Sequence, residues 1–303
     1  MSGISIEIPG LEGRFDKICM VYGPTGISTM RLHEISESEA PGDIAVIYAD
    51  MRRCMRLPLV NLIYRHLATM PDVLPWVWGA VRPAVLSGEL DAALDRLKRD
   101  LPLPELAPFD RTMLATLDGA DRFAIGPVLD AYNRGNGLNL IALTALCLAL
   151  HRPEAAGRGA TLPGETPSRA IPALPSLLKL GDLDAETAKR VRDIALLHGG
   201  GPRAVPSLYL HLAHWPRFLA AICDRIRPHL DDGSLGRTRE VAVELARDAA
   251  ERLLSSLASA SPPPAQHFDQ ITTVLDHFTR RVIPEMLPVG LAIDKALPHL
   301  RGS

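Results

Sequence analysis

The most constraining feature of this 303-residue chain is an internal repeat. Residues 59–90 match residues 204–235 without a gap at a constant offset of 145, and eleven of the thirty-two positions are identical. Unrelated segments of this length share about two identities. The match preserves the order Tyr-x-His-Leu-Ala-x-x-Pro, which helical periodicity alone does not produce, and a second match at offset 146 joins residues 125–132 to 271–278. The repeat predicts two copies of one structural unit, packed as a pseudo-dimer about an approximate twofold axis.

The repeated units have the sequence pattern of helices. Apolar residues recur at helical spacing, as at Ala242, Leu245, Ala246 and Ala249, and aromatic residues make up only 5% of the chain. Before about residue 35 the pattern differs, because ISIEI alternates and YGPTG has the composition of a turn, which favours a short strand or hairpin. We therefore predict an all-α fold of two tandem helical repeats that form an intramolecular pseudo-dimer.

Segment boundaries follow from the repeat and from a Pro- and Gly-rich stretch between its copies. Each copy is expected to contain about five or six helices. Pro71 and Pro216 are expected where a helix begins, and Gly88 and Gly233 where one ends, because these residue types are favoured there. The predicted segments are an N-terminal extension (1–39), helical repeat 1 (40–152), a linker (153–171) and helical repeat 2 (172–303).

Composition and charge argue against several classes of protein. The 33 Lys and Arg residues are balanced by 35 Asp and Glu residues, so the chain lacks the basic character of a nucleic-acid-binding protein. The N-terminus has no basic region followed by an apolar run, and the longest apolar stretch, 138–150, is shorter than the roughly 20 residues that span a bilayer. The four cysteines form no CxxC pair, and no His or Cys falls in a metal-ligand spacing beside a carboxylate. These features predict a cytoplasmic protein without a membrane, nucleic-acid or metal partner.

Two aspartates at related places are candidate general bases. Asp50 precedes Asn61 by 11 residues and Asp193 precedes Ser207 by 14, each pair across one helix-to-helix turn. General-base catalysis needs a carboxylate that takes the proton of a water and a second group, such as an amide or a hydroxyl, that orients the water oxygen. The alternative is a solvated aspartate on a helix face.

Four further features have a structural interpretation beside a functional one. His66 and His211 stand in identical contexts, which favours a hydrogen bond to a backbone carbonyl over a metal pair. The polar run 132–139 opens an apolar helix, and its Asn and Gly residues favour caps or turns, although such a cluster also suits a small carboxylate. The run 199–201 lacks the strand and the Gly-Lys-Ser/Thr of a phosphate loop. Three nearby arginines form either a cationic patch or ordinary surface charge: Arg52, Arg53 and Arg56.

The residues around the first copy resemble a known family. Residues 48–83 are similar to the DehI-type (group I) 2-haloacid dehalogenases. The similar string begins Tyr48-Ala-Asp-Met-Arg-Arg, continues through Leu-Pro-Leu-Val-Asn-Leu-Ile-Tyr-Arg-His-Leu-Ala and ends at Arg82-Pro83. The resemblance covers the chain from about residue 36 onward. It implies an all-α pseudo-dimer with one active site between the halves. It also implies hydrolytic dehalogenation of short 2-haloacids of either configuration, without a metal or organic cofactor.

The same resemblance implies roles for residues of this chain. In the family, an Asp of the second repeat activates a water that attacks the substrate Cα without an ester intermediate, and Asp193 stands at the matching place. Ser207 stands where an Asn orients the water, and Arg192 stands where a Ser precedes the Asp. The residues predicted to bind the substrate carboxylate or the departing halide are Tyr48, Asp50, Arg52, Arg53, Asn61, Arg192 and Tyr209.

Other functions stay open at this point. A non-catalytic protein that binds a small carboxylic acid, or a different hydrolase or isomerase of such an acid, is an alternative on the same scaffold. The helical repeat also resembles, more distantly, the carboxymuconolactone decarboxylase and AhpD-like proteins, but a thiol peroxidase is not expected without a CxxC pair. A homodimer is left open as the assembly.

Overall fold

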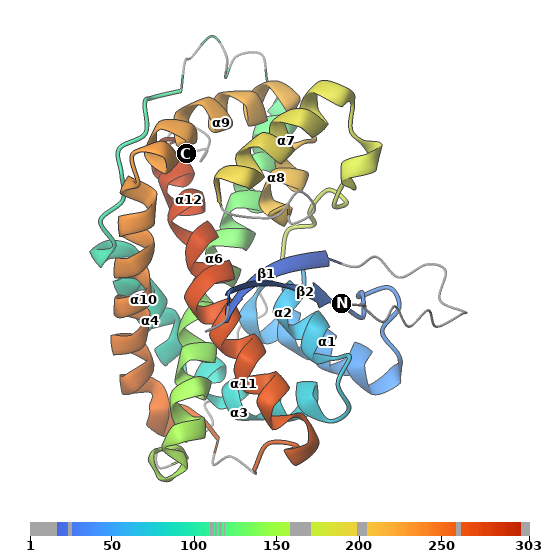
Figure 1. Ribbon diagram of the computed structural model, residues 1–303, viewed down its shortest axis with the longest axis vertical. Coiled ribbons are helices and arrows are strands. Elements are labelled where there is room, and N and C mark those ends of the chain that lie inside the picture. The colour runs from blue at the N-terminus through green and yellow to red at the C-terminus, as the bar shows by residue number, and fades with distance from the viewer. Residues whose placement is uncertain are drawn as a thin grey trace, which may run out of the picture.

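Helices form most of the described part of the computed structural model (Figure 1). The structure describes residues 17–23, 26–109, 112, 114, 117, 119–157, 171–198, 205–258 and 262–297. Its first elements are two antiparallel strands, β1 (Lys17–Gly23) and β2 (Gly26–Leu32), with Lys17 opposite Leu32 and Gly23 opposite Gly26. This pairing confirms the hairpin predicted before residue 35, whereas the ISIEI segment lies outside the described residues.

The helices fall into two series along the chain. The first comprises α1 (Gly42–Met55), α2 (Leu62–Leu67), α3 (Val73–Leu86), α4 (Glu89–Asp100), α6 (Gly119–His151) and the 3₁₀ turn η1 (Pro153–Ala155). The second begins with η2 (Leu180–Asp182), α7 (Ala185–Leu197), α8 (Ser207–Leu212), α9 (Pro216–Asp231), α10 (Ser234–Leu253) and η3 (Leu254–Ser256). It ends with η4 (Ala265–His267), α11 (Phe268–His277), the π-helical turn η5 (Phe278–Val282) and α12 (Ile283–Lys295). Apart from the hairpin, the all-α prediction is confirmed for the described residues.

Matching positions of the repeat take similar local structure. Gly88 and Gly233 each stand between two helices with a positive φ, 78° and 72°, which glycine adopts without strain. Pro216 is the first residue of α9, as predicted. Pro71 instead precedes α3 by two residues, because Asp72 takes a left-handed conformation with a φ of 64° immediately before the helix.

Two hydrophobic clusters hold the molecule together, and each draws helices from both series. One combines α1–α4 and the second half of α6 with α10 and α11. The other combines α7–α9 with the first half of α6 and part of α12. In Figure 1, α6 and α12 run side by side through the molecule, with α1–α3 toward one end and α7–α9 toward the other. The two series therefore share their cores, which the predicted segment boundaries do not suggest.

The polar run 132–139 lies inside a helix, so the prediction of a cap or turn there is wrong. α6 continues through it without a break from Gly119 to His151. Packing explains the glycines, because a Cβ at Gly137 would lie 2.2 Å from Leu94 Cδ1 and one at Gly135 would lie 3.0 Å from Asn61 Nδ2. These small residues let α4 and the start of α2 approach α6 closely.

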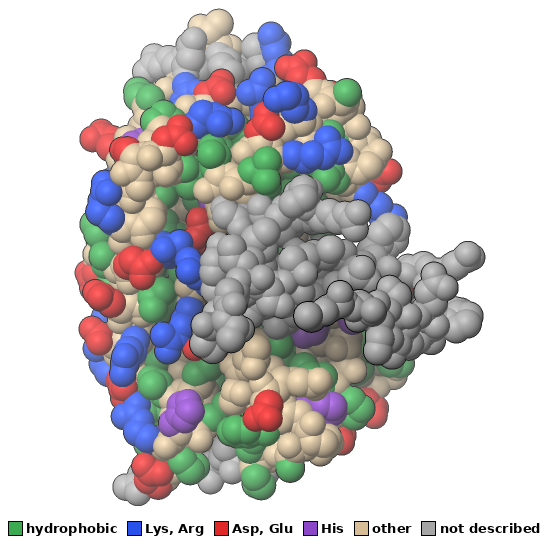
Figure 2. Space-filling view, viewed as in Figure 1, with side chains coloured by type: hydrophobic (Ala, Val, Ile, Leu, Met, Phe, Trp, Pro, Cys, Tyr) green, Lys and Arg blue, Asp and Glu red, His purple; other side chains and the backbone are tan. Residues whose placement is uncertain are grey.

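Charged side chains of both signs are interspersed on the face shown in Figure 2, including the flank along which α10 runs. Arg239 and Glu240 form one such ion pair within α10. Within the described part of the chain, no helix combines the length and the apolar character needed to cross a membrane.

Candidate functional site

Asp50 lies on α1 and is surrounded by hydrogen-bond donors. Its Oδ2 accepts a hydrogen bond from Trp78 Nε1 at 2.8 Å and another from Arg82 Nε at 2.7 Å, and its Oδ1 pairs with Arg53. Burial alone would raise the pKa of Asp50, but these bonds outweigh it and lower the pKa well below its usual range. A carboxylate stabilised in this way is a poor proton acceptor. Asp50 therefore serves to hold α1 against α3.

Asp193 occupies the same place in the second series. It follows Ala185, the first residue of α7, by eight positions, as Asp50 follows Gly42, the first residue of α1. Its Oδ2 accepts a hydrogen bond from Lys189 Nζ at 2.6 Å, which lowers the pKa of Asp193. The side chain is 39% exposed, and the neighbouring Arg192 is also exposed. Asp193 is therefore a partly solvated aspartate on a helix face, paired with Lys189 one helical turn before it.

Ser207 lies in the seam between α6 and α8. It is the first residue of α8, and its side chain is hydrogen-bonded to Tyr132 of α6. Among the described residues, no hydrogen bond joins Ser207 to Asp193. Asn61 immediately precedes α2, and the residue in the same place before α8 is Pro206, so Ser207 is offset by one residue from the position that corresponds to Asn61.

The two repeated histidines contact backbone carbonyls, as the sequence predicts. His66 Nδ1 lies 2.7 Å from the carbonyl oxygen of His33, and His211 Nε2 lies 3.0 Å from that of Pro175. Burial lowers the pKa of both imidazoles, which favours their neutral forms. The second ring nitrogen of His211 meets the Tyr132 hydroxyl at 2.8 Å. Their structural role is therefore confirmed.

Three other predicted substrate-binding residues have protein partners. Tyr48 is 2% exposed and donates its hydroxyl hydrogen to the carbonyl of Ile35 at 2.9 Å. Arg52 pairs with Glu37 at 2.7 Å, and Arg53 pairs with Asp50. The structure therefore does not bring the first-series residues together with Asp193 through any described hydrogen bond or ion pair.

A chain of four polar side chains joins α8, the end of α7, α12 and α10. Tyr209 is fully buried, and its hydroxyl lies 2.7 Å from His198 Nε2. His198 Nδ1 lies 3.1 Å from Glu285 Oε1, and Arg239 donates to Glu285 Oε2 at 3.0 Å. Burial alone would raise the pKa of Glu285, but the hydrogen bonds from His198 and Arg239 outweigh it and lower the pKa.

Sequence reasoning found only Tyr209 of this chain. His198 stands alone at a helix end, 11 residues before Tyr209, and Glu285 is 87 residues beyond His198. No local spacing connects them, because only the packing of α12 against the second series brings them together. The one available signal is that Tyr209 is identical in the two copies of the repeat.

Most of the buried polar atoms without a described partner lie in the first series, and His277 Nε2 of α11 is one in the second. The repeat pairs Tyr209 with Tyr64, whose hydroxyl is buried and has no hydrogen-bond partner among the described residues. Asn139 is 1% exposed, and neither its side-chain nitrogen nor its oxygen is paired there. Asn61 Oδ1 is likewise buried and has no hydrogen-bond partner among the described residues. Each such group lowers stability unless something bonds to it.

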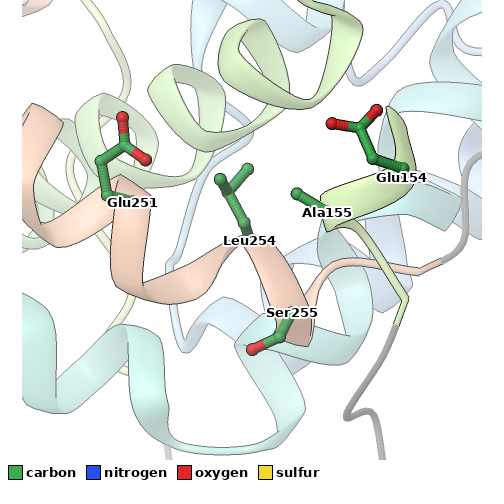
Figure 3. A pocket seen from close by; sticks show the side chains of 5 residues that line it. All are labelled: Glu154, Ala155, Glu251, Leu254 and Ser255. Carbon is green, nitrogen blue, oxygen red and sulfur yellow. The ribbon is translucent and has the colours of Figure 1, made fainter. Parts of the chain in front are cut away.

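One surface cavity among the described residues lies away from all these groups. It has a volume of about 400 Å³ and is lined by Glu154, Ala155, Glu251, Leu254 and Ser255. Figure 3 shows the two glutamates on opposite sides of Leu254. Arg152 pairs with Glu251 at 2.7 Å, so part of this acidic lining is already neutralised. None of the predicted site residues lines it.

Metal ligation has no support in the described ranges. They contain no group of three or more His, Cys, Asp or Glu side chains placed to hold one ion. Burial raises the pKa of Cys147 and Cys223 to about 12, so both are thiols at neutral pH. A metal-free reaction stays a prediction.

Comparison with characterised proteins gives a consistent set of relatives. The chain is 30% identical over 207 residues to a configuration-inverting 2-haloacid dehalogenase of Alcaligenes xylosoxydans xylosoxydans, an alignment that covers 64% of this chain and 67% of the relative. It is 26% identical over 209 residues to an enzyme of the same description from Pseudomonas sp. (strain 113), with 64% of this chain and 66% of the relative covered. An (R)-2-haloacid dehalogenase of Pseudomonas putida shares 33% identity over 51 residues, 17% of either chain. No protein-family model matches the chain.

Solved structures share the fold. A D-2-haloacid dehalogenase mutant superposes with a TM-score of 0.73 at 19% identity, covering 88% of this chain and 96% of the other. A D-2-haloacid dehalogenase in complex with L-LA superposes with a TM-score of 0.71 at the same identity and coverage. At this identity the superpositions establish the architecture, and the residues of a site must be argued from this chain.

Proposed function

The chain belongs to the configuration-inverting 2-haloacid dehalogenases, and on that premise we propose that it hydrolyses the carbon–halogen bond of a short 2-haloacid. The observation that carries the proposal is the 30% identity over 207 residues to an enzyme of that description. Because that alignment covers about two thirds of the relative, the activity of this chain is a proposal that the following experiments test.

The proposed reaction needs one base and no bound cofactor. A water oxygen attacks the substrate Cα, the halide leaves with the bonding electron pair, and the water proton passes to a carboxylate. We assign the carboxylate to Asp193 and the placement of the water to Ser207. Lys189 donates a hydrogen bond to Asp193 in this structure. The proposal therefore requires the lysine ammonium to turn from Asp193 to the carboxylate of the bound substrate. Arg192, exposed beside Asp193, provides a second cation for that anion.

We leave Asp50 and its surroundings out of the proposed reaction. Its two oxygens are taken by Trp78, Arg82 and Arg53, and Tyr48 and Arg52 are engaged by other residues. These groups are better explained as the packing contacts of α1 than as a site for an anionic substrate.

We also propose that residues 40–152 and 172–303 are two copies of one unit related by an approximate twofold axis. The support is the same order of helices in both series, the matching positions of Asp50 and Asp193, and the positive φ at both Gly88 and Gly233. A crystal structure in which Tyr64 and Tyr209 fail to coincide after superposition of the two copies would contradict it.

Halide release from purified protein tests the function. We expect release from 2-chloropropionate without added metal or cofactor, with the two enantiomers assayed separately. Asp193→Asn should lower kcat by about 10²-fold to 10⁴-fold, because the amide keeps the size of the side chain but cannot accept the proton. Asp50→Asn is the matched control at the equivalent helix position and should retain activity at temperatures below its unfolding transition.

The exposure of Asp193 favours one competing function. A carboxylate that is 39% exposed and paired with Lys189 fits a protein that binds a small carboxylic acid without converting it. Wild-type protein that releases no halide from either enantiomer, yet binds the acid by calorimetry, would establish that alternative.

A further inference from the structure

The chain Tyr209–His198–Glu285–Arg239 has a defined direction. Glu285 is a carboxylate, so it accepts hydrogen bonds from His198 Nδ1 and from Arg239 at 3.1 Å and 3.0 Å. With the hydrogen on Nδ1, the Nε2 atom of a neutral imidazole is an acceptor, and Tyr209 donates to it at 2.7 Å. Burial raises the pKa of Tyr209 well above its usual value, which keeps this hydroxyl protonated. A base whose second nitrogen is oriented by a carboxylate is the arrangement that enzymes use to fix an imidazole.

The equivalent place in the first series is built differently. The repeat pairs Tyr209 with Tyr64, and the offset of 143 between α7 and α1 pairs His198 with Met55. Offset 146 pairs Glu285 with Asn139, and offset 145 pairs Arg239 with Leu94. The tyrosine is thus kept in both copies, but the imidazole, the carboxylate and the guanidinium occur only in the second. A tyrosine alone suffices for packing, so the three added groups serve something that the second copy does and the first does not.

The polar chain fixes the two helices that carry the proposed site. His198 immediately follows α7, five residues beyond Asp193, and Tyr209 is in α8, two residues beyond Ser207. The His198 imidazole is 3% exposed, so its contact with Tyr209 is a buried link between the end of α7 and α8.

We propose that His198 and Glu285 are positioning residues for dehalogenation, which hold α7 and α8 in the relative placement that Asp193 and Ser207 require. This inference rests on the proposed function. Loss of either hydrogen bond of His198 would remove the buried link between the end of α7 and Tyr209 of α8. Misplacement of a reacting group by about 1 Å costs about 10²-fold in rate.

The groups that face His198 support this assignment. Tyr209 from α8 and Glu285 from α12 contact the ring directly, and Arg239 from α10 holds Glu285 from behind. Cys223 from α9 lies near the Tyr209 hydroxyl and stays a neutral thiol, because burial raises its pKa to about 12.

The test compares three variants with a matched control in the first copy. Glu285→Gln and Tyr209→Phe should lower kcat for 2-chloropropionate by about tenfold to a hundredfold with little change in KM. Tyr64→Phe removes the hydroxyl of the equivalent, unpartnered tyrosine and should leave kcat unchanged. His198→Gln keeps polar atoms for both neighbours but loses the ring that places them, so its kcat should also be lower than wild type with little change in KM.

The split between kcat and KM, measured below the unfolding transition of each variant, separates positioning from a purely structural role. A positioning role lowers kcat with little change in KM, whereas a purely structural role leaves both parameters of the folded variant at the wild-type values. Variants that match wild type in kcat would overturn the inference while leaving the proposed function intact. Wild-type protein without halide release overturns both.

Discussion

Asp50 and Arg82 join α1 to α3 through two hydrogen bonds, from Nε to Oδ2 at 2.7 Å and from the guanidinium to Oδ1 at 3.4 Å. The repeat places Arg227 at the position of Arg82, and Arg227 contributes to lowering the pKa of Asp193. The same pair of residue types thus recurs between α7 and α9. In the first series the pair is partly buried, whereas in the second the aspartate is paired with Lys189 at the surface. The two aspartates at equivalent helix positions therefore have different partners.

Asp50→Asn should destabilise the protein by about 1–3 kcal/mol, because the amide loses the charge-assisted bonds from Arg82 and Arg53. Urea unfolding followed by circular dichroism measures the change. Asp193→Asn is the control and should unfold close to wild type, since its only short ion pair is at the exposed surface. An equal loss of unfolding free energy in both variants would show that the two carboxylates contribute equally to stability.

The stability of the protein should depend on pH through Asp50. Its pKa is lower in the folded protein than in the unfolded chain, where an aspartate has a pKa of about 3.9. The carboxylate therefore contributes its full stabilisation above about pH 4 and loses it as the pH falls toward the folded pKa. Wild type should lose more free energy of unfolding than Asp50→Asn between about pH 5 and pH 2. Parallel curves for the two proteins would contradict this.

The sequence predicts the local structure better than the tertiary contacts. The repeat places Gly88 and Gly233 at helix junctions and identifies His66 and His211 as carbonyl partners, because both features depend on neighbours in the chain or in the matching copy. The run 132–139 gives a wrong prediction. Its glycines are required by the close approach of Leu94 and Asn61 to α6, and not by a turn.

The site residues show the same limit in sharper form. The spacing of Asp193 and Ser207 along the chain does not predict their side-chain partners. Asp193 is hydrogen-bonded to Lys189, and Ser207 to Tyr132. His198 and Glu285 are 87 residues apart, and their hydrogen bond depends on α12 lying against the end of α7. Such contacts follow from the packing of shared cores, which no local pattern encodes.

Gly290→Ala should destabilise the crossing of α12 and α6. A Cβ at Gly290 would lie 2.1 Å from Asn133 Oδ1, and Asn133 Nδ2 donates to the Gly290 carbonyl at 3.1 Å. The Asn133 amide is 2% exposed and cannot move into solvent without breaking that bond, so we expect a loss of about 1–3 kcal/mol. Gly79→Ala, in α3 with no atom within 4 Å of the new Cβ, should instead gain about 0.5–1 kcal/mol from helix propensity. Thermal unfolding should therefore move in opposite directions for the two alanines.

Separate halves of the chain should not fold alone. The cluster that contains α1–α4 is completed by Ala242, Ala246 and Ala249 of α10 and by Ile271 of α11, all at most 3% exposed. A fragment of residues 40–152 lacks these helices and would leave the buried face of α6 in water. We expect it to bind a hydrophobic dye and to unfold without a cooperative transition, as loosely packed states do. Addition of residues 153–303 at equal concentration should remove the dye signal and restore cooperative unfolding, because each half supplies helices to both cores. A fragment that unfolds cooperatively alone would mean that the first repeat has a sufficient core of its own and that the shared clusters contribute little to its stability.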